Sequence, residues 1–174
     1  MGKTVVFVVV SAGIAFLSGR SLRDPRAHGF HRFFAFEAML GLILVNADRW
    51  FEDPFSARQG VSWALLLASL MLAGHGFHLL RVAGRPRGSI EDTTELVSRG
   101  AYRWIRHPLY GSLLLLAWGA FLKDVSVVSW GLALAASGFL VATARVEEAE
   151  NVRKFGEPYA AYIKRTKMFL PRLY

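Results

Sequence analysis

A basic, aromatic segment and a downstream pair of carboxylates carry the groups of this chain best suited to chemistry. Arg106, His107 and Tyr110 fall within five residues, where a basic stretch meets an apolar run, and Glu147 and Glu148 follow the last apolar run. Such groups can hold a charged ligand or move a proton. Adjacent carboxylates point about 100° apart on a helix, so we expect only Glu147 to face a shared site. The sequence predicts one site, built from two segments, at a membrane surface.

The elements that hold these groups are apolar runs long enough to be membrane helices. Hydrophobic residues make up 53% of the 174, and the runs 61–80 and 125–144 contain no Asp, Glu, Lys or Arg. About 20 residues at 1.5 Å rise cross a 30 Å hydrocarbon layer. Three shorter runs, 4–19, 33–47 and 109–122, fit either spans or buried, half-inserted helices. We favour spans, so the predicted fold is an all-α, polytopic membrane protein with about five transmembrane helices, a C-terminal helical hairpin and a cytoplasmic tail.

The charges of the connecting loops support five spans. Basic residues gather between the first and second runs, between the third and fourth, and after the fifth, whereas the other two loops are not basic. The positive-inside rule then places the N-terminus outside and the C-terminus in the cytoplasm, and we expect the plasma (inner) membrane. The first run could instead be a signal peptide. It leads directly into a basic stretch at Arg20, which favours a retained anchor.

The net charge of +8 indicates attraction to anionic lipid headgroups rather than nucleic acid binding, because the basic residues flank apolar runs and form no separate domain. Cysteine is absent, which excludes disulfides and thiolate metal sites.

Pro108 predicts a helix that starts at the His107–Pro108 step. The last helix has no stop after Ala144 and is predicted to continue through Glu148 until Gly156 and Pro158 break it.

These motifs together resemble the isoprenylcysteine carboxyl methyltransferase family, and phospholipid N-methyltransferases are similar. The resemblance extends from about Thr93 to the C-terminus and is carried, in order, by Leu96–Val97, Gly100–Ala101–Tyr102, Arg106–His107–Pro108–Leu109–Tyr110, Glu147–Glu148, Phe155–Gly156, Tyr159 and Tyr162. It implies a single integral membrane methyltransferase domain over 1–174. Residues 1–82 would supply three N-terminal helices, and 83–174 would bind the cofactor.

The resemblance also implies S-adenosyl-L-methionine as the cofactor, bound on the cytoplasmic side, and a lipophilic small molecule or lipid as the acceptor. By the family pattern the cofactor contacts would be Leu96, Val97, Tyr102, His107, Pro108, Leu109, Tyr110 and Glu147. A carboxylate suits the cationic end of this cofactor, and aromatic or apolar groups suit adenine.

Departures from the family pattern leave the acceptor open. Prenylcysteine enzymes carry an arginine for the substrate carboxylate where this chain has Thr143, and Arg145, two positions away, is our candidate for that role. A carboxylate acceptor needs no general base. An amine acceptor must lose a proton before it attacks, and Glu148 or His107 would then be the catalytic base.

Two other classes of protein fit parts of the pattern. Sterol reductases share the His-Pro-x-Tyr step and a comparable tail over 170–174, but they are longer and use NADPH; a non-catalytic membrane scaffold could also keep these motifs. Within the apolar runs, Glu37, His75 and His78 are polar. We expect interhelical hydrogen bonds from them rather than a metal site, with Glu37 as an alternative lining residue of the acceptor cavity.

Overall fold

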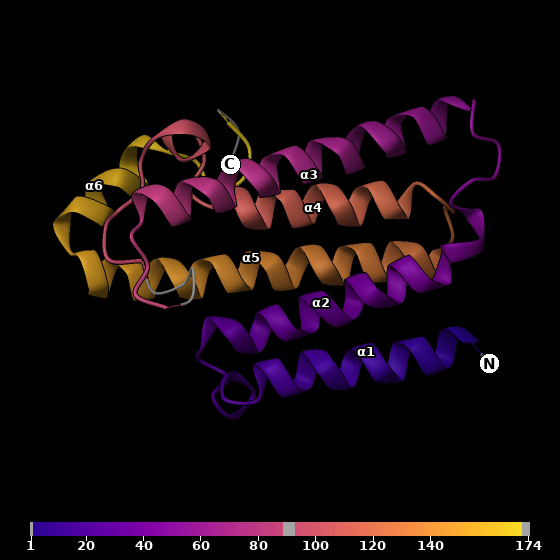
Figure 1. The fold of residues 1–174 in the computed structure, drawn as a ribbon, viewed down its shortest axis with the longest axis horizontal. Helices are drawn as coiled ribbons and strands as arrows, with labels where there is room; N and C mark the ends of the chain where they lie inside the picture. Colours follow the sequence, from indigo (N-terminus) through magenta and orange to yellow (C-terminus); the bar gives the residue numbers. More distant parts are fainter. Residues whose placement is uncertain (1, 89–92, 172–174) are drawn as a thin grey trace. The chain divides into compact units, whose positions relative to one another are not determined.

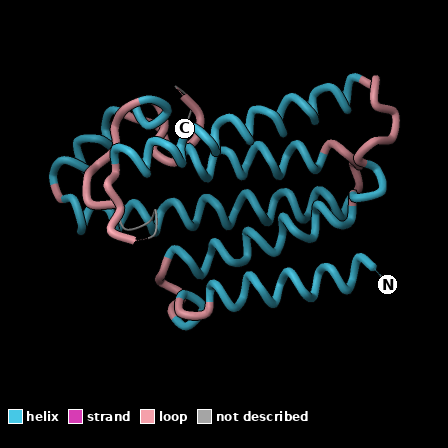
Figure 2. Tube along the Cα trace, viewed as in Figure 1, coloured by secondary structure: helices cyan, strands magenta, loops and turns pink. Residues whose placement is uncertain are grey.

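The computed structural model describes residues 2–88 and 93–171, and their regular structure is helical apart from one isolated β-bridge (Figures 1 and 2). The α-helices are α1 (Gly2–Ser18), α2 (His28–Val45), α3 (Ala57–Ala83), α4 (Pro108–Phe121), α5 (Val127–Phe155) and α6 (Glu157–Arg165). Short 3-10 turns are η1 (Ser21–Arg23), η2 (Ala47–Arg49) and η3 (Gly100–Arg103).

The five predicted apolar runs coincide with α1 to α5, which confirms the all-α, polytopic membrane fold. By length and composition α2, α3 and α5 can cross a membrane, and α1 and α4 are shorter apolar helices. Both α2 and α3 begin several residues before the apolar runs 33–47 and 61–80. Hydropathy marks the part of a helix that suits lipid, whereas the helix itself extends as far as its backbone hydrogen bonds continue.

The helices begin and end where the Pro and Gly residues of the sequence predicted. Helix α4 begins at Pro108, and α5 continues past Glu148 to Phe155. Gly156 has a φ of 64°, which an L side chain rarely adopts, so it separates α5 from α6. Pro158 lies in the first turn of α6, where its missing N–H leaves no helical hydrogen bond unmade.

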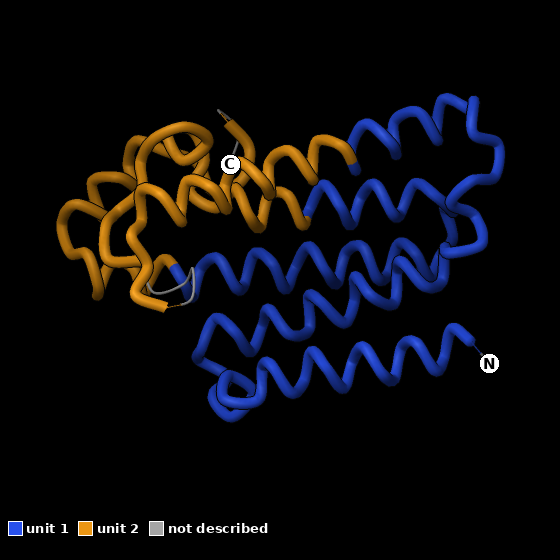
Figure 3. The backbone as a smooth tube through the Cα atoms, viewed as in Figure 1, with its two compact units in different colours: residues 1–66, 114–147 blue, residues 67–113, 148–174 orange. Residues whose placement is uncertain are grey.

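The chain forms two compact units (Figure 3), and α3, α4 and α5 each contribute to both. The first unit comprises residues 1–66 and 114–147. Here α1 packs against α2, and buried Asn46, at the end of α2, donates to the carbonyl of Ala120 and accepts a hydrogen bond from Ser129. Lys123, in the turn after α4, is fully buried: its Nζ donates to Gln59 over 2.8 Å and lies 3.6 Å from the centre of the Trp63 ring. Burial lowers the pKa of Lys123.

The second unit comprises residues 67–113 and 148–174, of which 172–174, part of the predicted tail motif, lie outside the described residues. Within it α3 and α4 approach closely. A Cβ added to Gly76 of α3 would lie 3.2 Å from the Leu109 side chain and 3.4 Å from Pro108. The Ser69 hydroxyl of α3 also donates to the Ser112 carbonyl of α4. These contacts fix the start of α4 against α3.

Candidate functional site

The segment just before α4 is held by backbone hydrogen bonds from the C-terminal tail. The N–H of Arg106 donates to the carbonyl of Lys167 over 2.7 Å, and that of His107 donates to Met168. The N–H of Lys167 donates in turn to Trp104, so Ile105 and Lys167 form a parallel β-bridge. These hydrogen bonds hold the backbone of Arg106 and His107 against the tail and so position the two side chains.

The Arg106 side chain joins the start of α4 to α5, α6 and the tail. Its Nε donates to Glu148 Oε1 over 2.6 Å, and its terminal nitrogen donates to the carbonyls of Thr166 and Ile163. Only 9% of the side chain is exposed. A buried guanidinium is costly unless it is paired and hydrogen-bonded, and here it is both.

His107 and Glu148 form the second contact of this cluster. His107 Nε2 lies 3.1 Å from the same Glu148 Oε1, and the exposed fractions of the two side chains are 3% and 15%. Glu148 lies in the polar extension of α5, beyond the apolar run. Burial works to raise the pKa of its carboxyl, but the hydrogen bonds from His107 and Arg106 outweigh burial and hold the pKa below its ordinary value. An ionised carboxylate only accepts, so we assign a hydrogen to His107 Nε2.

Aromatic rings surround the His107 imidazole. Tyr110, one turn along α4, stacks on it with ring centres 5.5 Å apart and an interplanar angle of 21°, and Phe169 of the tail lies 6.1 Å away. Tyr162 of α6 donates its hydroxyl to the carbonyl of Tyr102 in η3. Burial raises the pKa of Tyr162, which keeps the hydroxyl protonated as a donor.

The other residues implied by the family pattern have separate positions. Leu96 and Val97 line a cavity of about 300 Å³ after the end of α3. Pro108 and Leu109 pack against α3 at Gly76. Of the two adjacent carboxylates, Glu148 is the one that contacts Arg106 and His107. Glu147 and Arg145 belong to the first compact unit, so their approach to a ligand stays a prediction.

Two features of the site were not predicted from the sequence: the central place of Arg106 and the backbone pairing with residues 166–168. Arg106 was open to inference, since an arginine at the start of an apolar helix needs a carboxylate partner if it becomes buried. The pairing with residues 166–168 could not be inferred, because hydrogen bonds between backbone groups do not require particular side chains and so leave no recognisable sequence pattern. In the part of the chain that the structure describes, no group of three or more His, Asp or Glu residues could hold a metal ion.

A carboxylate that holds one imidazole nitrogen orients the ring and leaves the other nitrogen available to a proton. The geometry of Glu148 and His107 therefore suits proton transfer or ligand positioning beside aromatic rings. The sequence profile of a family described as phospholipid methyltransferase matches residues 57–157, which contain both groups.

Curated relatives carry two kinds of name. A methanethiol S-methyltransferase of Pseudomonas deceptionensis is 30% identical over 149 residues, which cover 82% of this chain and 50% of the relative. The cobalt-zinc-cadmium resistance protein CzcN of Cupriavidus metallidurans is 31% identical over 137 residues, which cover 78% of this chain and 59% of the relative. A methanethiol S-methyltransferase of Mycobacterium tuberculosis is 25% identical over 117 residues. The chain thus spans about half the length of the first of these relatives. No solved structure matches the chain significantly.

Proposed function

Because the chain belongs to the phospholipid methyltransferase family, we propose that it transfers a methyl group from S-adenosylmethionine to a lipophilic or lipid acceptor at the cytoplasmic face of the membrane. The observation that carries this proposal is the buried contact of His107, at the start of α4, with Glu148 in the polar extension of α5. The basic loops and the charged end of α5 support a cytoplasmic site.

The residues present fit this cofactor. Stacked aromatic rings at His107 and Tyr110 suit a purine, and the cavity beside Leu96 and Val97 has room for part of a ligand. The family pattern implies that Glu147, the residue before Glu148 in α5, contacts the cationic end of the cofactor, and we keep it as the candidate for that role. When bound, the cofactor supplies an electrophilic methyl group on a sulfonium.

The residues of the chain would position the acceptor, exclude water and take up a proton. His107, held by Glu148 through Nε2, has Nδ1 left to accept the proton of a thiol or amine acceptor. Glu148 is a weak base because its pKa is lowered, so His107 is the better candidate for this step. Arg145 remains our candidate for holding a carboxylate acceptor.

The names of the methanethiol S-methyltransferase relatives make a small thiol the first acceptor to test. The experiment is a methyl-transfer assay on the purified full-length chain in detergent, with methyl-labelled S-adenosylmethionine and either a small thiol, an ethanolamine lipid or a prenylated cysteine. We expect labelled product with one class of acceptor and its loss in His107→Ala.

Calorimetry separates this proposal from the reductase and scaffold alternatives. We expect S-adenosylhomocysteine to bind and NADPH not to bind. NADPH binding alone would favour a reductase, and binding of neither ligand would favour the scaffold; both results contradict methyl transfer.

A further inference from the structure

The turn that follows α3 is tightly constructed. The carbonyl of Gly84 accepts hydrogen bonds from the N–H groups of Thr94 and Glu95, at 2.8 and 3.2 Å, and the Thr94 hydroxyl donates to the carbonyl of Arg85. A Cβ on Gly84 would lie 2.6 Å from the Leu80 carbonyl and 2.7 Å from the Thr93 side chain. Residues 93–95 are therefore held by hydrogen bonds and close packing against the end of α3.

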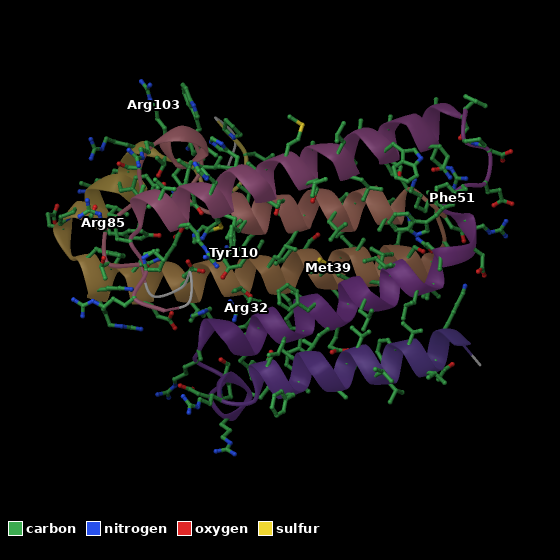
Figure 4. The ribbon with its side chains drawn as sticks, in the orientation of Figure 1. Arg32, Met39, Phe51, Arg85, Arg103 and Tyr110 are labelled. Carbon is green, nitrogen blue, oxygen red and sulfur yellow. The ribbon has the colours of Figure 1, made fainter. Side chains whose placement is uncertain are left out.

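Arg85 has a strained backbone within this turn (labelled in Figure 4). Its φ is 43°, a left-handed conformation that a residue with a side chain rarely adopts. Such strain persists where the surroundings impose it, and it concentrates at functional sites. The Arg85 guanidinium forms an ion pair with Glu95 over 3.0 Å at the surface, where both side chains are more than half exposed.

Arg85 and Glu95 line the cavity of about 300 Å³ introduced above, together with Arg99, Ser98 and the Leu96–Val97 pair. We call this cavity the Arg85–Arg99 pocket. Two guanidinium groups face one carboxylate, so the charge of the lining is positive by one. Among residues 2–88 and 93–171, no carboxylate forms an ion pair with Arg99. The pocket thus offers a guanidinium with unused donors beside one that is already paired.

We propose that the Arg85–Arg99 pocket binds an anionic oxygen group, a carboxylate or a phosphate, of a ligand used in the proposed methyl transfer. Guanidinium groups bind both anions through paired N–H donors. Two ligands carry this chemistry: the amino-acid end of the cofactor and the phosphate of a phospholipid headgroup. Glu95 competes with the ligand for Arg85 and so weakens anion binding. This inference rests on the proposed function.

The test is calorimetry on the full-length chain in dodecyl maltoside, a detergent without phosphate. The probes are S-adenosylhomocysteine, with 5′-methylthioadenosine as its counterpart without the amino-acid end, and dioctanoyl phosphatidic acid, with dioctanoylglycerol as its counterpart without phosphate. The variants are Arg99→Gln and Glu95→Gln. Arg87→Gln is the matched control, since it removes an equal charge from an exposed residue of the same loop that does not line the pocket.

The two anionic probes are phosphatidic acid and S-adenosylhomocysteine, which has no net charge but carries a carboxylate. We expect Arg99→Gln to weaken the binding of one of them about tenfold, the size of one charge-assisted hydrogen bond. The counterpart without the anionic group should bind Arg99→Gln as it binds wild type, and Arg87→Gln should bind all probes as wild type does. Glu95→Gln should tighten the same probe, a change of sign that a merely structural role would not produce. Loss of S-adenosylhomocysteine affinity identifies the cofactor carboxylate as the anion, and loss of phosphatidic acid affinity identifies the lipid phosphate.

Equal affinity of both anionic probes for wild type and Arg99→Gln overturns the inference, and so does an equal loss for charged and neutral probes. If wild type binds S-adenosylhomocysteine but neither probe depends on Arg99, the pocket inference fails alone. If S-adenosylhomocysteine does not bind wild type while phosphatidic acid shows the expected pattern, the proposed cofactor fails and the anion pocket stands. Binding of neither anionic probe to wild type overturns both.

Discussion

Replacing Glu148 with glutamine should destabilise the chain, because it leaves the buried Arg106 guanidinium without its carboxylate. Breaking a fully buried ion pair from one side costs about 3–5 kcal/mol. Arg106 keeps its bonds to the carbonyls of Thr166 and Ile163, and Glu148 retains 15% exposure, so we expect the loss to be about 2–3 kcal/mol. For a chain of this size that corresponds to a fall in Tm of roughly 4–12 °C.

Thermal unfolding in detergent measures this loss, and the chain offers a matched control. Arg49 and Glu52 form an ion pair of the same chemistry at 2.6 Å, but their side chains are 50% and 46% exposed. Glu52→Gln should therefore cost less than about 1 kcal/mol. Arg106→Gln and the Arg106→Gln/Glu148→Gln double variant complete a cycle, in which we expect a coupling of about 1–3 kcal/mol.

A stabilising role of the buried pair is refuted if Glu148→Gln lowers the Tm no more than Glu52→Gln, or if the cycle gives a coupling near zero. Either result would mean that the pair is solvated in the folded chain. A large loss in Glu148→Gln with no loss in Arg106→Gln would contradict it as well, since both variants break the same contact.

Four further predictions follow from the second unit and the sequence. The pKa of Glu148 is lowered in the folded state, so its charge stabilises the fold above the ordinary glutamate pKa of about 4.3. This stability is lost as the pH falls through the lower folded pKa. Glu148→Gln should therefore reduce the dependence of the Tm on pH in this acid range. His75 Nε2 accepts the N–H of Ala101 over 3.3 Å, so His75→Leu should cost about 1 kcal/mol and His75→Gln, which keeps an acceptor, should cost less, as measured by Tm. Gly100 has a φ of 60°, and a Cβ there would lie 2.5 Å from Leu79, so Gly100→Ala should lower stability by about 1–3 kcal/mol; an unchanged Tm would contradict this packing. The chain contains no cysteine, so a membrane-impermeant maleimide applied to intact cells should label Lys3→Cys but not Lys164→Cys, and both after permeabilisation; the reverse pattern would invert the proposed topology.

Hydropathy predicted the helices well because a membrane span must be both long and apolar. It did not predict α6, a helix of only nine residues that carries three charges and owes its packing to buried Tyr159 and Tyr162. The buried Lys123 is a similar case. A lysine in a short turn is ordinarily exposed, and only its contacts with Gln59 and Trp63 explain its burial.

The candidate site was partly open to sequence reasoning. The types and spacing of His107 and the two glutamates pointed to one cluster, and the structure brings His107 and Glu148 together. The choice between adjacent glutamates depends on the rotation of α5 about its axis. Packing of the whole helix sets that rotation, so a local stretch of sequence does not reveal it.

The bond from Arg106 to Thr166 joins residues 60 positions apart. During synthesis the apolar helices emerge and enter the membrane first, whereas the backbone partners of Arg106 and His107 are among the last of the described residues to be made. Insertion and maturation of the site are therefore successive events. A chain interrupted after α5 would keep all five apolar helices for insertion into the bilayer. The segment before α4 would then lack the backbone partners of Arg106 and His107.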